Sequence, residues 1–513
     1  MRGTGETNPG HAEPIRYLDV LEAQRLVDFS ALRLAPAVAA GALLFAQTND
    51  FVCGALMFAT LLLFDSAIAR LSYPLHLMPV SRALLVLAAP VAAALVVYSA
   101  ESGVTAMSAD ALVVAVVGSW LISALGIWVA GSLRDVRKVP LAVVGAEQFA
   151  RDLAAELEHT RPAAFEVAGW LGSEPIAPAV DAPPWLGDVS DACDAFTEHG
   201  IELVVHAPMA AISRPRSADV QEQLAAACLE NDARLIWANQ FCEEVLGHVP
   251  LGATNAAWFR YLMHPRYRAG SVLGKRAFDV VIGSLLALAA APLLAAAAIA
   301  IRAEGGGSIL YRQRRIGQRG REFEMLKLRT MCQDAERDGP RWSGNDDNRV
   351  TRVGRFLRRT HIDELPQLLN VLHGEMSLVG PRPERPELVG SLRDEVRFYD
   401  RRHLAKPGMT GWAQVRCGYA GSMSGTAFKL CHDLYYLKYR SVPRDLLIMF
   451  ETVVVLTKKI LFVQPAVEPS PLASAAGTLN GAPLNAPPLQ SLELNLSEGR
   501  VNEPDRVLDA DLA

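Results

Sequence analysis

Four long apolar runs, separated by short polar loops, lie in the N-terminal part of the chain. They cover residues 29–47, 51–69, 83–99 and 111–131. Each run is close to the ~20 residues that a helix needs to cross the hydrocarbon core of a bilayer. Arginines precede the first run and separate the second from the third, and Arg and Lys follow the fourth, whereas the other two loops carry only acidic charges. The pattern predicts a bundle of four transmembrane helices within residues 29–135, with both ends in the cytoplasm. A buried four-helix core is the alternative.

The two ends of the chain are polar. Residues 1–28 mix both signs of charge and lack the apolar core of a signal peptide, so we expect a cytoplasmic N-terminal segment. Residues 463–513 contain no aromatic residue and hold 7 prolines, with 7 acidic against 2 basic residues. Such a segment buries too little apolar surface to offset the entropy lost on ordering. We expect a disordered tail without a catalytic part.

A fifth apolar stretch, residues 277–301, differs from the other four. Pro292 lies near its middle, where it removes a backbone hydrogen bond and favours a kink. Both flanks are basic, with Lys275 and Arg276 before the stretch and Arg302 after it. A straight span would place one basic flank outside. The pattern therefore favours a re-entrant helix, broken at Pro292, that enters and leaves on one face of the membrane, over a full span.

Residues 139–265 change character, because short apolar runs there alternate with helical patterns. This alternation is typical of a small parallel α/β domain. The first strand is followed by a single glycine, Gly145, and not by the G-x-G-x-x-G of a dinucleotide site. A structural, assembly or regulatory module is therefore favoured over nucleotide binding. The expected strands are 139–145, 165–171 and 201–206, and the expected helices are 146–158 and 189–199.

A basic region follows the fifth apolar stretch. Residues 301–360 hold 15 Lys and Arg against 8 Asp and Glu. The segments 311–317 (YRQRRIG) and 325–330 (MLKLRT) alternate cationic and apolar residues, as half-buried strands do. Lys327 and Arg329 would share one face of such a strand and could clamp a pyrophosphate. A solvated basic face is the alternative.

Residues 354–374 (GRFLRRTHIDELPQLLNVLHG) have a leucine spacing typical of one helix face. Pro366 is tolerated only in a first helical turn, so we expect the helix to begin near Glu364 with Asp363 at its N-cap. The helix N-terminus would keep the Asp363 carboxylate ionised and attract phosphate. Surrounded by cations, this carboxylate could attack phosphorus, and Glu364 could bind Mg²⁺. The alternative is a plain N-cap beside solvated arginines.

Two further segments are candidates for ligand contacts. Residues 378–384 (LVGPRPE) present Arg382 between two prolines. Residues 406–414 (KPGMTGWAQ) are rich in glycine and include Trp412, a candidate for stacking or for the membrane interface. Tight loops without a ligand are the alternative for both segments.

The composition narrows the classes of partner. The net charge of −5 indicates no polyanion partner, so nucleic acid is not expected, and 51% of the residues are hydrophobic. The seven cysteines form no C-x-x-C motif, which indicates neither a zinc site nor a disulfide framework. The soluble parts are therefore expected to face a reducing compartment.

Several of these motifs together resemble the bacterial sugar transferase family, the polyprenyl-phosphate sugar-1-phosphate transferases. They occur in the family's order between residues 270 and 460. The four spans and the α/β domain resemble the family's long form, which initiates exopolysaccharide or O-antigen repeat units. The motifs are KRAFD (275–279), YRQRRIG, LRRTHIDELPQLLNVLHGEMSLVGPRPE (357–384), KPGMTGWAQVR (406–416) and HDLYYLKY (432–439).

The resemblance implies an architecture. It comprises a four-helix transmembrane bundle, a Rossmann-like α/β middle domain and a mainly helical catalytic domain, residues 270–462, with a re-entrant helix over 277–301. The family's break in that helix is often Ser-Pro, whereas this chain has Ala291-Pro292, which removes one partner for a freed carbonyl. The implied location is the bacterial cytoplasmic (inner) membrane, multi-pass, with the catalytic domain facing the cytoplasm.

The resemblance also implies a reaction in two steps. Asp363 would attack the phosphate next to the sugar of a UDP-sugar, release UMP and hold the sugar phosphate until a polyprenyl (undecaprenyl) phosphate accepts it. Glu364 is implied as a second catalytic residue and Mg²⁺ ligand. The implied phosphate-binding residues are Arg358 and Arg382, and Lys327, Arg329, Lys275 and Arg276 are further candidates for that role.

Two other classes of function stay open at this stage. One is a glycosyltransferase that moves the sugar alone and releases UDP. The other is a non-enzymatic membrane scaffold for polysaccharide assembly, against which the intact Asp363, Glu364 and Arg382 argue. The sequence also leaves open the sugar, the polymer, whether copies of the chain associate, and whether other polysaccharide-assembly proteins bind it.

Overall fold

A computed structural model describes residues 138–159, 165–173, 182–207, 217–254, 272–305, 307–332, 349–417 and 423–461, with isolated positions elsewhere. The chain divides into two compact units, Met1–Arg137 and Lys138–Ala513. The predicted N-terminal segment 1–28, most of the four predicted spans within 29–135 and the predicted tail 463–513 lie outside the described residues. Within the residues that the structure describes, one helix, Val272–Glu304, is long and apolar enough to cross a membrane.

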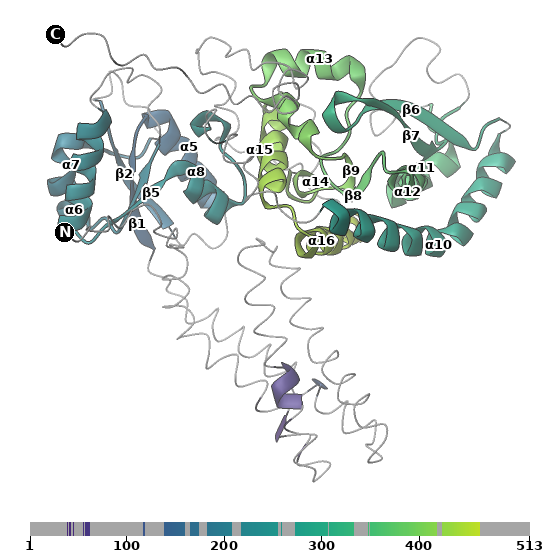
Figure 1. Cartoon of the computed structure of the whole chain (residues 1–513), viewed down its shortest axis with the longest axis horizontal. Coiled ribbons are helices and arrows are strands. Elements are labelled where there is room, and N and C mark those ends of the chain that lie inside the picture. The colour runs from purple at the N-terminus through teal and green to yellow at the C-terminus, as the bar shows by residue number, and fades with distance from the viewer. Residues whose placement is uncertain are drawn as a thin grey trace, which may run out of the picture. The chain divides into compact units, whose positions relative to one another are not determined.

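The second unit begins with a five-stranded parallel sheet in the order β3-β2-β1-β4-β5. Helices cover both faces, with α6 and α7 on one side and α5 and α8 on the other (Figure 1). The strands are β1 (Val139–Val144), β2 (Phe165–Leu171), β3 (Trp185–Gly187), β4 (Leu203–His206) and β5 (Arg234–Trp237). The helices are α5 (Glu147–His159), η1 (Val189–Asp191), α6 (Ala192–His199), α7 (Ser217–Glu230) and α8 (Ala238–Phe241).

The parallel α/β arrangement predicted for this region is confirmed, and the three expected strands are present. Strands β1 and β4 are buried along nearly all of their length, because they lie in the middle of the sheet with helices on both faces. The two edge strands were not predicted. β3 has only three residues, and in β5 only Ile236 is buried, so neither has the apolar run that identifies a central strand.

The catalytic region of the resemblance begins with α10 (Val272–Glu304), a single helix of 33 residues that contains Pro292. A straight helix of that length would extend about 50 Å, well beyond the thickness of a bilayer core. The predicted break of the helix at Pro292 is wrong, because α10 continues through that residue as a single helix. The helix nevertheless changes direction along its length (Figure 1), as expected where a proline removes a backbone hydrogen bond.

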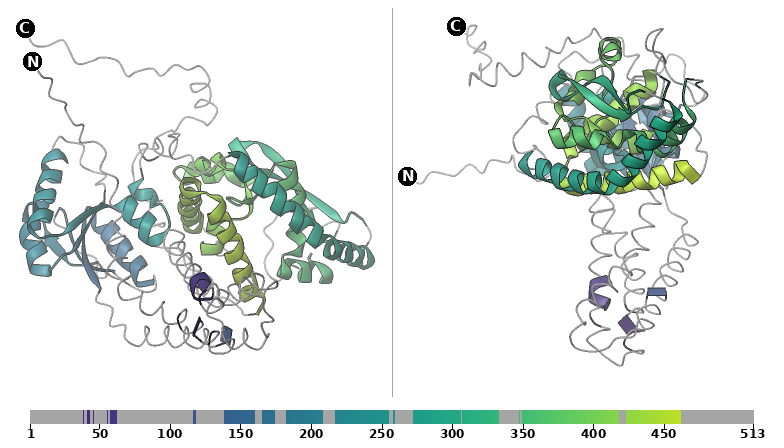
Figure 2. Two further views of the ribbon diagram at one scale, coloured as in Figure 1. Left: turned by 60° about the horizontal axis from the view of Figure 1, so that its bottom comes forward. Right: turned by 90° about the vertical axis from the view of Figure 1, so that its right-hand side faces the viewer.

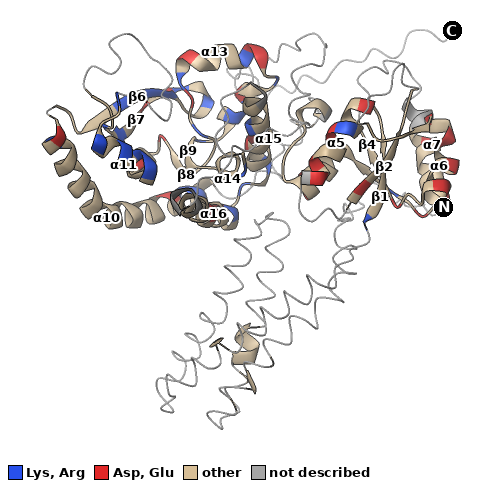
Figure 3. Cartoon of the chain, turned by 180° about the vertical axis from the view of Figure 1, so that it is seen from behind, with Lys and Arg blue, Asp and Glu red and all other residues tan. Residues whose placement is uncertain are grey.

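Most of α10 carries apolar side chains that the described structure leaves uncovered. Leu285, Leu288 and Ile299 each expose more than half of their surface, at 59%, 74% and 71%. The helix runs along the same side as α16 (Val442–Leu461) (Figure 2). Charge is nearly absent from the central part of α10. Lys and Arg gather instead on α11 (Arg352–Thr360) and on the hairpin of β6 (Leu310–Ile316) and β7 (Glu322–Leu328) (Figure 3). An uncovered apolar surface of this kind marks a membrane or protein contact.

Short elements follow α10 and surround the predicted catalytic residues. The two cationic segments are strands, as their alternation predicted, and they form an antiparallel hairpin in whose register Arg314 lies opposite Glu324 and Tyr311 opposite Lys327. The elements are β6 (Leu310–Ile316), η5 (Gln318–Gly320), β7 (Glu322–Leu328), α11 (Arg352–Thr360), η6 (Ile362–Glu364), α12 (Gln367–His373), β8 (Ser377–Val379), α13 (Pro386–Glu395), η7 (Tyr399–Leu404), β9 (Gly408–Thr410), α14 (Trp412–Cys417) and α15 (Met423–Tyr439).

Three glycines allow two predicted loops to pack backbone against backbone. Gly380 donates its N–H to the carbonyl of Thr410 at 2.9 Å, and Gly408 donates to the carbonyl of Pro381 at 2.9 Å. A Cβ on Gly408 would lie 2.1 Å from the Gly380 nitrogen, and a Cβ on Gly411 would lie 2.2 Å from the Gly380 carbonyl oxygen. The short parallel pair β8–β9 therefore depends on glycine, and it fixes where the Pro-Arg-Pro segment leaves the sheet.

The chain after the α/β sheet packs against α14 and α15. Val249 donates its N–H to the carbonyl of Cys431 at 3.1 Å. Glu243, in η2 (Cys242–Leu246), accepts hydrogen bonds from Trp258, Lys438 and Tyr439. Buried carboxylates of this kind require such donors, because an unpaired charge away from water is costly. These contacts join the segment 242–258 to the catalytic region.

Trp412 also contacts this segment. It is 1% exposed, donates its indole N–H to the Gly247 carbonyl at 2.8 Å and stacks on Tyr435. Of the two roles considered for Trp412, stacking agrees with the structure, although the partner is a protein ring, and the membrane interface does not, because the indole is enclosed by protein.

The packing of the glycines can be tested by adding one methyl group. Gly408→Ala should lower the free energy of unfolding by at least ~1–3 kcal/mol, because overpacking of an interior has that cost and here the neighbour is backbone. Gly390→Ala is the matched control, since a Cβ there meets nothing within 4 Å and the residue lies in α13. Thermal denaturation should show a lower midpoint for the first variant and an unchanged or higher one for the second. Equal midpoints would contradict the packing described.

Candidate active site

Asp363 and Glu364 lie in a tight turn between two helices. α11 begins at the N-cap Thr351, whose hydroxyl accepts from the Gly354 N–H at 2.9 Å, and it ends at His361 with φ of 57°. The 3₁₀ turn η6 follows, and α12 begins only at Gln367. The prediction of a helix start near Glu364 with Asp363 as its N-cap is therefore wrong. Pro366 donates no backbone hydrogen bond, and the residues before it close shorter i→i+3 bonds instead.

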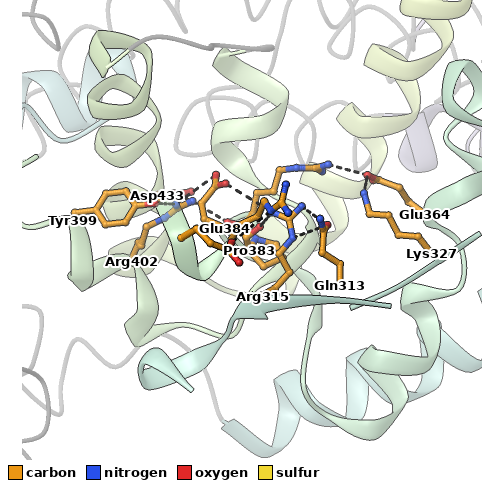
Figure 4. Close-up of polar contacts among 12 residues, drawn as sticks. Gln313, Arg315, Lys327, Glu364, Pro383, Glu384, Tyr399, Arg402 and Asp433 are labelled. Atoms are coloured by element: carbon orange, nitrogen blue, oxygen red, sulfur yellow. Dashed lines mark hydrogen bonds and ion pairs between the residues drawn. The ribbon is translucent and has the colours of Figure 1, made fainter. Parts of the chain in front are cut away.

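Glu364 is the centre of the polar contacts in this turn. Its Oε1 accepts from the Lys327 ammonium at 2.8 Å and from the Arg382 guanidinium at 2.8 Å (Figure 4). Its side chain is 18% exposed. Burial opposes ionisation, but the charges of Arg382 and Lys327 outweigh it and hold the pKa of Glu364 well below its usual range. Glu364 is therefore a fixed anion that gathers two cations from distant segments.

Asp363 has the opposite electrostatic setting. It is 7% exposed, and its Oδ1 has no hydrogen-bond partner among the described residues. Burial and the neighbouring charge of Glu364 raise the pKa of Asp363 to about 6, although Lys327 and Arg358 oppose the shift. No α-helix begins at Asp363, because it lies in the three-residue 3₁₀ turn η6 and α12 begins only at Gln367, so the predicted α-helix N-terminus does not act on this carboxylate. At neutral pH Asp363 is still mostly ionised, with a desolvated oxygen that is available for a new bond.

Lys327 reaches the turn because the β6–β7 hairpin is attached to α12. The side chain of Asn370 accepts from the Leu326 N–H at 3.0 Å and donates to the Glu324 carbonyl at 2.7 Å. These bonds complete the edge of β7 as another strand would. They place the strand residue next to Leu326, Lys327, opposite Glu364. Burial and Arg382 lower the pKa of Lys327, against the opposing effect of Glu364.

Arg358 lies on the other side of Asp363. Its Nε donates to the buried hydroxyl of Thr330 at 2.8 Å, and its charge acts on the Asp363 carboxylate. The close approach of α11 to Thr330 depends on Gly354, where a Cβ would lie 2.0 Å from the Thr330 carbonyl oxygen. The structure thus brings together Asp363, Glu364, Lys327, Arg358 and Arg382, as their predicted roles require.

Three other predicted phosphate-binding residues have different partners. Arg329 donates to the Gly305 carbonyl at 2.7 Å, whereas Lys327 donates to Glu364, so the two cations of the expected clamp have different partners here. Arg276 donates to the carbonyls of Val371 and Leu372, both at 2.6 Å, and thereby caps the C-terminus of α12.

Lys275 forms ion pairs with Asp279 at 3.1 Å and with Asp445 at 2.7 Å. Asp279 in turn accepts from the Ser377 hydroxyl and the Leu378 N–H. The KRAFD motif therefore attaches α10 to β8, α12 and α16, and the contacts that the structure shows for it are structural.

Sequence reasoning missed two arginines that contact the loop of Arg382. Arg315 donates to the Pro383 carbonyl at 3.0 Å, and Arg402 donates to the Arg382 carbonyl at 3.1 Å (Figure 4). The YRQRRIG motif contains Arg315 and could have drawn attention to it. Nothing in the local pattern around Arg402 distinguishes it from the neighbouring Arg401.

The part of the chain that contains this site is similar in sequence to known proteins. A family model described as bacterial sugar transferase matches residues 270–459. The chain is 43% identical over 179 residues to a UDP-N-acetylgalactosamine-undecaprenyl-phosphate N-acetylgalactosaminephosphotransferase of Aeromonas hydrophila, covering 35% of this chain and 42% of that protein. It is 46% identical to a UDP-glucose:undecaprenyl-phosphate glucose-1-phosphate transferase of Caulobacter vibrioides, covering 37% of this chain and 72% of that protein.

A third relative is matched along nearly all of its length. The exopolysaccharide production protein PSS of Rhizobium leguminosarum bv. phaseoli is 41% identical, and the match covers 35% of this chain and 93% of that protein. By contrast, the match covers only 42% of the Aeromonas relative and 35% of the undecaprenyl-phosphate glucose phosphotransferase of Komagataeibacter xylinus. The motifs, the site and these matches together show that the chain belongs to the bacterial sugar transferase family.

Proposed function

We propose that the protein transfers a sugar-1-phosphate from a UDP-sugar to a polyprenyl phosphate such as undecaprenyl phosphate, and releases UMP. This would be the initiating step of an exopolysaccharide or O-antigen-type glycan. The observation that carries the proposal is the buried Asp363 oxygen without a partner, next to a Glu364 carboxylate that two cations hold. The names of the Aeromonas and Caulobacter relatives support the same class of reaction.

In the first step of this proposal, Asp363 is the nucleophile. A carboxylate oxygen attacks the phosphorus that carries the sugar, and the bond from that phosphorus to the UMP oxygen breaks. In this proposal Lys327, Arg358 and Arg382 neutralise charge on the diphosphate, because the first and third contact Glu364 and the charge of Arg358 acts on Asp363. The products are UMP and a sugar phosphate bound to Asp363.

In the second step an oxygen of the polyprenyl phosphate attacks the same phosphorus. The bond to Asp363 breaks, the carboxylate is regenerated, and a diphosphate linkage joins sugar and lipid. The pKa of about 6 suits both roles of Asp363, since the group is ionised at neutral pH and is still a competent leaving group. Arg382, which is 47% exposed in its side chain, is the cation best placed to contact an incoming phosphate.

The donor set at the turn fits a Mg²⁺ ion held largely by substrate. Mg²⁺ usually takes one or two carboxylates together with phosphate oxygens and water. Asp363 and Glu364 offer two carboxylates, and the described residues contain no group of three or more His, Cys, Asp or Glu side chains that could hold a metal without substrate. We therefore propose Glu364 as the protein ligand of Mg²⁺, which would supply additional positive charge to the diphosphate. Lys327 and Arg382 already occupy Glu364 Oε1, so much of that neutralisation comes from the protein itself.

The lipid substrate requires a membrane location, which we propose to be the bacterial inner membrane, with the catalytic region on the cytoplasmic side. The apolar residues of α10 support this, because Leu285 and Leu288 stay largely exposed among the residues that the structure describes. We further propose that α10 enters and leaves the membrane on one face. This places the lipid phosphate and the water-soluble UDP-sugar at the same surface.

The reaction class is tested by the nucleotide that is released. Membranes with the protein, Mg²⁺ and polyprenyl phosphate should release UMP from one member of a panel that includes UDP-glucose and UDP-N-acetylgalactosamine. Asp363→Asn, a nearly isosteric change, should lower the rate by roughly 10⁴–10⁶-fold, as loss of a nucleophile does. Release of UDP would indicate a glycosyltransferase instead, and substantial turnover by the variant would exclude Asp363 as the nucleophile.

The two cations of the MLKLRT segment provide a matched pair of variants. Lys327→Met should lower kcat by about 10²–10³-fold, because it removes a charge-assisted donor beside the reacting carboxylates. Arg329→Met should lower turnover much less, since Arg329 donates to the Gly305 carbonyl, whereas Lys327 donates directly to Glu364. UMP release by the two purified variants measures the difference. Equal losses would show that the pyrophosphate clamp forms when substrate binds.

The pKa of Asp363 predicts the acidic limb of the pH–rate profile. The carboxylate must be ionised to attack, so kcat/KM should fall as pH is lowered through about 6, by about tenfold per pH unit. Glu364 does not contribute to this limb, because its pKa lies well below the usual carboxyl range. A profile of UMP release between pH 4.5 and 8 tests this expectation. Constant activity down to pH 4.5 would contradict it.

A further inference from the structure

A second arginine binds the backbone of the loop that presents Arg382. Arg402, in η7, is 5% exposed and donates from Nη2 to the Arg382 carbonyl at 3.1 Å. Its Nη1 donates to the Tyr399 hydroxyl at 2.8 Å. The carboxylate of Glu384 lies 3.8 Å from the same Nη1. Arg402 thus binds the backbone of the residue whose side chain reaches Glu364.

Arg402 itself is fixed by a buried carboxylate from another helix. Its Nη2 lies 2.8 Å from Oδ2 of Asp433, which is 2% exposed and belongs to α15. Both partners are removed from water, so each depends on the other to balance its charge. Tyr399 also packs its ring against the guanidinium, with the centroid 5.2 Å away. The ion pair is therefore held in one geometry by α15 and η7 together (Figure 4).

The opposite side of the loop is held by Arg315 from β6. It donates to the Pro383 carbonyl, and Gln313 accepts two bonds from the same guanidinium, at 3.1 and 2.7 Å. Glu384 lies between the two arginines, with its carboxylate 4.0 Å from Arg315. The side chain of Arg382 is long and 47% exposed, so its own contacts cannot fix it with precision. The position of its backbone decides whether it reaches Glu364.

We propose that Arg402 and Asp433 are positioning residues, which act on the reaction by fixing the backbone of Arg382 so that its guanidinium stays on Glu364. On this proposal, neither Arg402 nor Asp433 touches the reacting groups. The series runs from Asp433 to Arg402, to the Arg382 carbonyl, and from the Arg382 side chain to Glu364. The kinetic part of this inference rests on the proposed sugar-phosphate transfer, whereas the structural part does not.

The kinetic test is a double-mutant cycle between Asp433 and Arg382. Asp433→Asn should lower kcat for UMP release by up to about 100-fold, the cost of a displacement near 1 Å of a group that aligns the reaction. Arg382→Ala should lower it at least as much. The double variant should be no slower than Arg382→Ala alone, because Asp433 acts only through Arg382. Losses that multiply in the double variant would overturn the proposal.

The structural test is hydrogen exchange of the peptide that spans residues 380–384. Asp433→Asn should speed exchange of its amides, because the Arg402 contact with the loop is loosened. Glu451→Gln is the matched control, since Glu451 is fully buried and pairs with Arg416 at 3.4 Å in the same region. It should lower thermal stability without changing exchange at 380–384. Unchanged exchange in Asp433→Asn, or equal changes in both variants, would overturn the proposal.

A milder variant covers the case in which Asp433→Asn does not fold, because that change leaves Arg402 buried without its counter-charge. Tyr399→Phe keeps both charges and removes only the hydroxyl that accepts from Arg402. It should give a smaller change in the same direction in both measurements. If wild-type protein releases UMP from no donor, the proposed function fails, while the exchange comparison still decides whether Arg402 and Asp433 position the loop.

Discussion

The arrangement of the site depends on one carboxylate, Glu364, which two cations share. Lys327 comes from a β-hairpin and Arg382 from a loop between two prolines, and both reach the same oxygen of Glu364. The attraction of opposite charges in a partly buried setting holds three segments together, although each is anchored separately. Asp363 shares the same turn, yet it keeps an unpartnered oxygen and a raised pKa. Neighbouring carboxylates thereby acquire different chemistry from their surroundings alone.

Most of the surrounding fold provides the anchors for those three segments. Asn370 binds the edge of β7 and fixes the hairpin, while the glycines of β8 and β9 let two backbones approach closely. Arg276 caps α12 from α10, so the long apolar helix is attached to the element that follows the catalytic turn. Stability and the geometry of the site are coupled here, since each anchor both fills the interior and sets the position of a charged side chain at the turn.

The sequence predicted what depends on local pattern and missed what depends on distant contacts. The parallel strands 139–144, 165–171 and 203–206 were found because buried strands carry continuous apolar runs. Asp363 and Glu364 were found from a motif, but the helix start was misplaced, since it depends on how the chain turns before Pro366. The alternation in β7 placed Lys327 and Arg329 on one face, yet it could not show that Lys327 contacts Glu364 while Arg329 contacts the Gly305 carbonyl. Arg402 and Asp433 were missed because 31 positions separate them and no periodicity connects them.

The contacts of Glu243 bear on where this protein can be divided. The residues that match the family model begin at 270, but Lys438 and Tyr439 within that region donate to a carboxylate that precedes it, and Trp412 donates to Gly247. A fragment that begins at residue 270 would leave these three donors without the acceptors named here and would uncover the part of α15 that packs against Glu243. The segment that follows the sheet is thus part of the packing of the region that matches the family model, and the smallest fragment that keeps this packing includes it.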